Sequence, residues 1–212
     1  MNRNVFINCP FDNKFFPILK GILFTLVYLD FNPLISETDN SGASRLTKIQ
    51  NYIRDANLSI HDLSRTESFE KPKRFWQKRK AVLPRMNMPF ELGLDFGAKY
   101  YNTDEHGTKK FLILEAEKYL YQKVISDIAG RDTVAHQNSV ELGIKAVRNW
   151  LNLNFPSEGI PRHVDIYATF ADFLYENDPI LREEGIDPND VNDNQFSDII
   201  GDMRIWIGEL ED

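Results

Sequence analysis

Short apolar and β-branched runs alternate with longer segments of helical periodicity along residues 1–155, and this alternation limits the fold more than any other feature of the sequence. The short runs are Val5–Cys9, Phe31–Ser36, Leu58–Asp62 and Lys110–Glu115. Strands that are buried on both faces of a parallel sheet are nearly continuously apolar, whereas strands with one wet face alternate. Each run is therefore predicted to be a buried strand of a parallel sheet.

Apolar side chains recur at helical spacing in the segments that separate and follow these runs. The first such helix follows Asp12, which can cap it, and the others are predicted over residues 44–57, 87–101, 119–128 and 139–153. A fifth strand is not obvious from the sequence. Right-handed crossovers place helices on both faces of such a sheet. The order predicts an α/β fold of the flavodoxin-like, doubly wound kind with four to five parallel strands.

The character of the chain changes beyond Pro156, where proline and acidic residues become frequent. Two amphipathic stretches follow, His163–Tyr175 and Phe196–Leu210. We expect residues 1–155 to form the α/β domain and residues 156–212 to form a helical C-terminal extension packed on it.

Charge and cysteine content narrow the classes of function and the expected location. The net charge of −7 argues against a surface that attracts nucleic acid throughout, because such attraction needs clustered Lys and Arg. Cys9 is the single cysteine, so no intrachain disulfide can form. The N-terminus lacks the apolar core of a signal peptide, and no apolar run reaches the length of a membrane span. A cytoplasmic protein is expected.

Ligands of open parallel sheets bind beyond the carboxyl ends of the strands, where loops and helix N-termini converge. Polar residues follow three of the predicted strands, in the segments 8–12, 36–39 and 61–65. A further carboxylate, Glu91, lies in the first turns of the helix that begins at Asn87, where backbone N–H groups favour negative charge. Glu91 could serve the helix dipole alone or stand at a ligand site. Gly93 and Gly97 would allow close approach of a backbone or a ligand to that helix.

Blocks of sequence between Val5 and about Leu151 resemble a family of bacterial proteins that begin Val-Phe-Ile-Asn-Cys-Pro-Phe-Asp. The blocks are Val5–Asp12, Ile60–Arg65, Arg85–Gly93 and Ser126–Gly130. This family is in turn similar to nucleoside 2-deoxyribosyltransferases and to Toll/interleukin-1 receptor (TIR) domains that cleave NAD. Ile7–Phe11 resembles the transferase motif that ends the first strand, Asp62 the acid that ends the third, and Phe90–Gly93 the helix with the catalytic glutamate.

The resemblance implies substitution at a glycosidic carbon, with positive charge developing on the sugar. Glu91 and Asp62 are the implied catalytic residues, with Glu91 stabilising that charge or attacking the sugar. Asp62, Asp12 and Asn8 could instead hold ribose hydroxyls, and the alternatives for them are helix caps and strand-end turns. Arg45 and Arg65 could pair with phosphate or be ordinary surface charges. The full predicted substrate-binding set is Asn8, Pro10, Phe11, Asp12, Arg45, Ser64, Arg65 and Asn87.

Three functions follow as hypotheses. The first is a TIR-like hydrolase that cleaves the N-glycosidic bond of NAD or a related nucleotide, as an antiviral-defence effector in bacteria. The second is a noncatalytic nucleotide-binding sensor, and the third is a nucleoside deoxyribosyltransferase. The glycine-rich GxGxxG cradle is absent from the sequence, which argues against NAD as a redox cofactor. NAD as a substrate is what the resemblance implies, since the families that cleave it do not use that cradle. Self-association fits all three hypotheses.

Other patterns in the sequence have separate interpretations. Arg131 and His136 have a spacing found in some helical ribonucleases, but the predicted strands contradict an all-helical bundle. The basic segment 71–85 is interpreted as a solvated lid, with contact to nucleic acid as the less favoured alternative. His61 is expected to be packed or hydrogen-bonded, and Cys9 to be buried. No Cys or His cluster has metal-ligand spacing.

Overall fold

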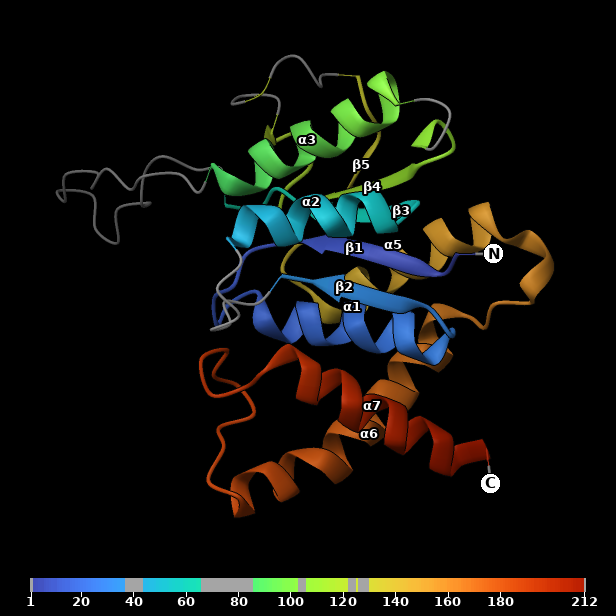
Figure 1. Ribbon diagram of the computed structural model, residues 1–212. Helices are drawn as coiled ribbons and strands as arrows, with labels where there is room; N and C mark the ends of the chain where they lie inside the picture. The colour runs from blue at the N-terminus through green and yellow to red at the C-terminus, as the bar shows by residue number, and fades with distance from the viewer. Residues whose placement is uncertain are drawn as a thin grey trace, which may run out of the picture.

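The computed structural model of the chain describes residues 2–36, 44–65, 86–102, 106–121, 125 and 130–211. Figure 1 shows a central sheet with helices on both sides and two further helices below it. The strands are β1 (Asn4–Asn8), β2 (Asn32–Ile35), β3 (Leu58–Asp62), β4 (Lys110–Glu115) and β5 (Thr133–Ala135). The helices are α1 (Phe16–Tyr28), α2 (Arg45–Asp55), α3 (Asn87–Tyr101), α5 (Val140–Asn154), α6 (His163–Glu183) and α7 (Phe196–Glu211), with a short 3-10 helix η3 (Pro156–Glu158).

The five strands form one parallel sheet in the order β2-β1-β3-β4-β5. This order confirms the flavodoxin-like, doubly wound architecture. Because all strands run the same way, the segments that follow β1, β3 and β5 leave the sheet at one edge. Ligands of open parallel sheets bind beyond the carboxyl ends of the strands, so this edge is where a ligand site is expected.

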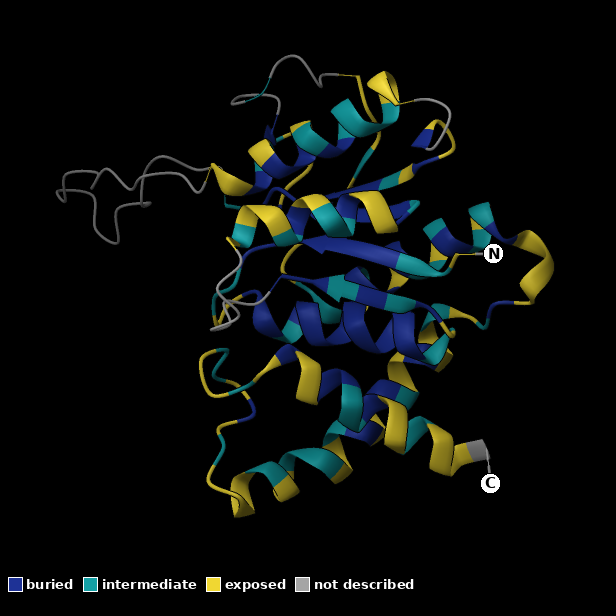
Figure 2. Cartoon of the chain, in the orientation of Figure 1, coloured by how far each residue is buried: buried dark blue, intermediate teal, exposed yellow. Residues whose placement is uncertain are grey.

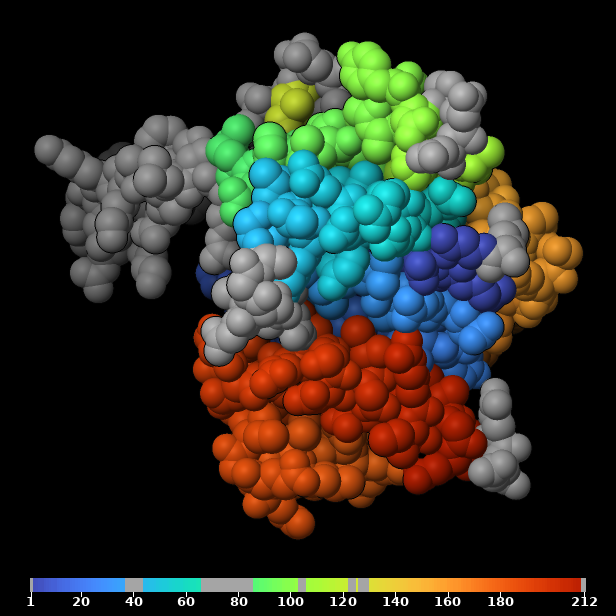
Figure 3. Space-filling model, in the orientation of Figure 1, coloured from blue at the N-terminus to red at the C-terminus, as the bar shows by residue number. Residues whose placement is uncertain are grey.

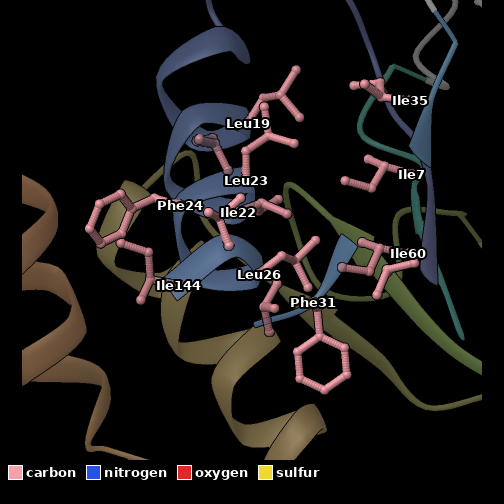
Figure 4. Close-up of a cluster of buried hydrophobic side chains, with 14 of the residues drawn as sticks. Ile7, Leu19, Ile22, Leu23, Phe24, Leu26, Phe31, Ile35, Ile60 and Ile144 are labelled. Atoms are coloured by element: carbon pink, nitrogen blue, oxygen red, sulfur yellow. The ribbon is translucent and has the colours of Figure 1, made fainter. Parts of the chain in front are cut away.

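Alternate side chains of the strands enter two separate apolar layers. Val5 and Ile7 of β1 pack toward α1 and α5, where Figure 4 shows Ile7 and Ile60 facing the apolar side chains of α1. Phe6, between them, packs on the opposite face against Ile49 and Ile53 of α2. This alternation is the period-2 geometry of a strand, and both faces are dry, so the runs read as continuously apolar.

Helix α1 is the most deeply buried helix, as its dark colour in Figure 2 shows. It contacts the sheet on one side and α5, α6 and α7 on the others, which explains why apolar residues occur around its whole circumference. Gly21 and Gly143 lie where α1 and α5 cross, and a Cβ at either would meet a neighbouring side chain at 2.9 Å. Close approach of the two helices therefore depends on these glycines.

The C-terminal helices α6 and α7 share the apolar cluster of α1 and α5, through Phe170, Phe173 and Phe196 among others. Figure 3 shows them as the lower part of the molecule. Lys20 of α1 is buried and donates a hydrogen bond from Nζ to the Pro188 carbonyl oxygen at 2.9 Å. Burial lowers the pKa of Lys20, and the nearby Asp178 carboxylate opposes that change. The extension thus supplies both apolar and polar contacts to α1.

Several details differ from the expectations. The strand β5 was not obvious because three residues are too few for a periodic pattern. Helix α6 continues to Glu183, past Pro179, although proline commonly ends a helix. Leu46 is exposed although it is apolar, whereas Ile49 and Ile53 of the same helix are buried. The helix predicted over residues 119–128 falls largely outside the described residues.

Among the described helices, none has both the length and the apolar character needed to cross a bilayer.

Candidate functional site

Glu91 lies near the N-terminal end of α3, on the edge of the sheet where the strands end. Only 3% of its surface is exposed, so it does not point into bulk water. Its Oε1 is 3.2 Å from Nη2 of Arg45, the first residue of α2. Burial raises the pKa of Glu91, and the positive charge of Arg45 offsets part of the rise. A buried carboxylate with one partly exposed cationic partner is an arrangement typical of functional sites.

Phe11 lies beside the same pair. The Arg45 guanidinium carbon is 5.9 Å from the centre of the Phe11 ring. The ring of Phe11 in turn lies 5.1 Å from that of Phe196, at the start of α7. Arg45 therefore bridges the carboxylate and an aromatic surface that the extension supports.

Replacing Arg45 with methionine is expected to raise the pKa of Glu91 further, because burial would then act without an opposing charge. A carboxyl group whose pKa is raised in the folded state stabilises the fold at low pH and loses that contribution as pH rises through the raised value. The variant should therefore lose about 1 kcal/mol at pH 7, since Arg45 is partly exposed, and much less at pH 4. Urea denaturation at the two pH values measures the difference. Arg54→Met, on the same helix, removes only the exposed ion pair with Asp55 and should show a much smaller pH dependence. An equal loss for Arg45→Met at both pH values would contradict the assignment.

The pKa of the Cys9 thiol reflects the burial and the negative charges at the end of β1. Burial raises the pKa of its thiol well above the usual value, and the charges of Asp62, Glu91 and Asp12 raise it further. Cys9 is therefore a neutral thiol and a poor nucleophile. The three carboxylates act on one buried atom, which places all of them around the end of this strand.

Asp12 and Arg65 pair with each other. The Arg65 guanidinium donates from Nε and Nη2 to the two Asp12 oxygens, each at 2.9 Å. Asp12 Oδ1 also accepts the backbone N–H groups of Lys14 and Phe15, so Asp12 closes the turn before α1 and does not cap the helix itself. The bidentate pair ties the loop after β1 to the loop after β3.

Asp62 is fully buried, and both of its oxygens are occupied. Oδ1 accepts the Ser64 backbone N–H at 2.9 Å, and Oδ2 is 3.1 Å from Nε2 of His136. This geometry gives Asp62 the part of a positioning residue that orders the end of β3.

Ser64, His136 and Asp62 nevertheless do not form a catalytic triad. Ser64 Oγ and Asp62 Oδ2 both contact the same histidine nitrogen, Nε2, while Nδ1 accepts the Asn138 backbone N–H at 3.0 Å. Nε2 must then carry the proton, and no lone pair remains to activate the serine. In a triad the two partners face different ring nitrogens.

A buried polar chain lies between α3 and the strands β1 and β3. Asn8 Nδ2 donates to the Met88 carbonyl oxygen at 2.8 Å and faces His61 Nδ1 at 3.0 Å. Because Met88 fixes the orientation of the amide, His61 Nδ1 accepts and Nε2–H donates to Asp95 Oδ2 at 3.0 Å. Lys109 Nζ pairs with the other Asp95 oxygen at 3.1 Å. Asn8 and His61 therefore seat the helix that carries Glu91.

The remaining predicted residues have different settings. Pro10 is buried directly after Cys9, and Asn87 is exposed at the first residue of α3, one turn before Glu91. No described residue lies within 4 Å of a Cβ built on Gly93, so the approach of a backbone or a ligand to this position stays a prediction. The basic segment 71–85 and the acidic end of segment 36–39 fall outside the described residues.

Arg131 and His136 lie in different surroundings, at the two ends of β5. The Arg131 guanidinium carbon lies 4.6 Å from the centre of the Phe96 ring, and His136 is buried beside Asp62. They do not form a common acid–base site.

Sequence reasoning missed the roles of His136, Asp95 and Lys109. His136 directly follows β5, so the strand-end rule would have selected it had the strand been recognised. No sequence signal links Asp95 with Lys109. Within the described ranges, no group of three or more His, Cys, Asp or Glu side chains is arranged to hold a metal ion.

Comparison of the chain with family models, with curated proteins and with solved structures gave no match.

Proposed function

We propose that this chain hydrolyses the N-glycosidic bond of NAD or a related nucleotide, with Glu91 as the catalytic carboxylate and bacterial antiviral defence as its setting. The single observation that carries the proposal is the placement of Glu91: buried, at the carboxyl edge of a doubly wound sheet, and paired with one partly exposed cation. In an apolar setting a carboxylate interacts strongly with a positive charge that develops beside it.

In the proposed reaction the bond between the ribose C1′ and the nicotinamide nitrogen breaks, and both bonding electrons leave with nicotinamide. The ribose gains oxocarbenium character, which the ionised Glu91 stabilises or captures as a glycosyl ester. Water then supplies the hydroxyl group at C1′ and releases a proton, so the products are nicotinamide and ADP-ribose. Arg45 is proposed to exchange its contact with Glu91 for a contact with substrate phosphate.

Incubation of the purified full chain with NAD, followed by chromatography, tests the proposal. Nicotinamide and ADP-ribose should appear in equal amounts. A parallel incubation with a deoxynucleoside and a free base should give no exchanged nucleoside, and exchange there would favour a deoxyribosyltransferase instead. If NAD and related nucleotides are recovered unchanged in all incubations, the hydrolase proposal fails.

A second candidate, a noncatalytic nucleotide sensor, is favoured by the contacts of the extension with the site. Phe196 packs on Phe11, and the Val191 backbone N–H donates to Asn13 Oδ1 at 3.0 Å. Movement of the loop after β1 would therefore change the contacts of this loop with α7 and with the segment before it. A nucleotide that raises the midpoint of thermal unfolding without being turned over would support this candidate, because selective binding to the folded state stabilises it.

A further inference from the structure

A second region of the molecule, distinct from the Glu91 edge, has the form of a binding site. A cavity of about 730 Å³ lies at the β5 side of the sheet, between α3 and α5. Helix α3 contributes Phe96 and Lys99 to it, from beyond the turns that carry Glu91, and β4 contributes its first residues, Lys110 and Phe111. The cavity therefore reaches the amino end of β4, away from the edge where the catalytic carboxylate is proposed.

Among the described strands, β5 is too short to pair with the first residues of β4. β5 pairs with β4 only from Ile113 onward. The Lys110 backbone N–H points to β3, where it donates to the Asn57 carbonyl oxygen at 2.9 Å. Successive residues of a strand direct their backbone groups to opposite sides, so those of Phe111 face the open side. The cavity thus offers backbone donors and acceptors in addition to side chains.

The lining carries an unbalanced positive charge. Lys110, Lys145 and Arg131 are exposed, and within the described ranges none has a carboxylate oxygen within 4 Å. Asp132 is the one acidic residue among the described lining residues. Cations gathered in one cavity repel each other, and a bound anion would relieve that repulsion. This clustering occurs in a chain whose net charge is −7.

Arg131 is already held in place. Its guanidinium carbon lies over the Phe96 ring, and its Nη2 donates a hydrogen bond to the Tyr100 hydroxyl oxygen at 2.8 Å. These contacts reduce the conformational freedom that the side chain would lose on binding an anion.

Aromatic and amide side chains complete the lining. Trp150 offers a flat apolar surface, whereas the Phe111 ring is already packed against Phe96 and Lys99. Asn149 and Asn154 offer hydrogen-bond donors and acceptors. The volume lies in the range of small-molecule sites. Flat surfaces suit a planar base, amides suit its polar edge, and guanidinium and ammonium groups suit phosphate. An acidic peptide would use the cations without needing these surfaces.

We propose that this cavity is a second ligand site, which binds a nucleotide through its phosphate groups and its base. It does not depend on the glycosidic chemistry proposed for Glu91.

Isothermal titration calorimetry of the full chain with ADP tests the proposal. Lys145→Glu, which reverses an exposed charge in the cavity, should weaken ADP binding about tenfold or more. Arg162→Glu makes the same charge change at the exposed start of α6 and should leave the affinity unchanged. Adenosine and inorganic pyrophosphate should each bind much more weakly than ADP.

Four results would overturn the proposal: no binding of ADP at millimolar concentration, full affinity in Lys145→Glu, pyrophosphate binding as tightly as ADP, or displacement of ADP by oligoglutamate. The Glu91→Gln variant separates the two sites. ADP binding that is lost in Glu91→Gln and kept in Lys145→Glu would assign the nucleotide to the proposed catalytic site and remove the second site. Failure of NAD hydrolysis with Lys145-dependent ADP binding would leave the second site standing.

Discussion

The Glu91→Gln variant is expected to release nicotinamide from NAD about a thousandfold more slowly than the parent chain. Glutamine keeps the shape of the side chain but cannot carry negative charge, so the stabilisation of an oxocarbenium-like sugar is lost. A thousandfold change corresponds to about 4 kcal/mol in the activation free energy. Initial rates of nicotinamide release at saturating NAD, measured by chromatography, give the ratio directly.

The matched control is Glu141→Gln. Glu141 lies in the first turn of α5 and is exposed, whereas Glu91 is buried one turn into α3. If Glu91 merely complements the helix dipole, the two variants should behave alike, with full activity and a stability loss of about 0.3–1 kcal/mol each. Full activity in Glu91→Gln would remove Glu91 from the mechanism.

Glu91→Gln is expected to slow the reaction but not to lower the stability of the fold. Burial raises the pKa of Glu91, so ionisation of this group costs stability in the folded state. Its stabilising contribution is present below the unfolded pKa and is lost as pH rises through the raised value. Glu91→Gln should accordingly be at least as stable as the parent at pH 7 and gain nothing at pH 4. A site that sacrifices stability for a charged group is expected where that charge has a function.

Lys109→Met is expected to destabilise the fold by about 3–5 kcal/mol, which is a large part of the stability of a typical domain. Lys109 is fully buried and pairs with the equally buried Asp95. Its Nζ also donates to the carbonyl oxygens of Ile53, at 2.7 Å, and Ala56, at the C-terminal end of α2. Methionine would fill the space but leave a buried charge and two carbonyl groups without their donor.

The midpoint and slope of urea unfolding measure this loss. Lys110→Met provides the neighbouring control, because Lys110 is exposed and should change stability by no more than about 0.5 kcal/mol. Burial lowers the pKa of Lys109, and Asp95 opposes the shift. A loss near that of Lys110→Met would mean that Lys109 is not held as a charged group in the folded chain.

The sheet was predictable from sequence because strands that are buried on both faces are nearly continuously apolar. β3 and β4 occupy the predicted residues 58–62 and 110–115, and α3 spans the predicted residues 87–101. The sequence did not predict β5, because the segment is too short for a pattern. It also did not predict the full length of α6, because this helix continues past Pro179 although proline commonly ends a helix.

The candidate site was predictable only in outline. The strand-end rule gathers Glu91, Asp62 and Asp12 around Cys9, where their charges act together. It does not reveal that Arg45 pairs with Glu91 or that Arg65 pairs with Asp12, since these partners come from loops and helices far apart in sequence. Side-chain pairing depends on distances of a few ångström, which periodicity and residue type do not encode.

The buried polar chain between α3 and the strands β1 and β3 determines how accurately Glu91 is positioned. Apolar contacts tolerate a small slide of one helix over a sheet, but a hydrogen bond fails when its angle or length changes. A shift of α3 by one residue would turn the Asp95 carboxylate away from His61 and Lys109 and remove the carbonyl group of Met88 from Asn8. The hydrogen bonds thus hold α3 in a single register, and Glu91, one turn before Asp95, is held in a fixed position with it.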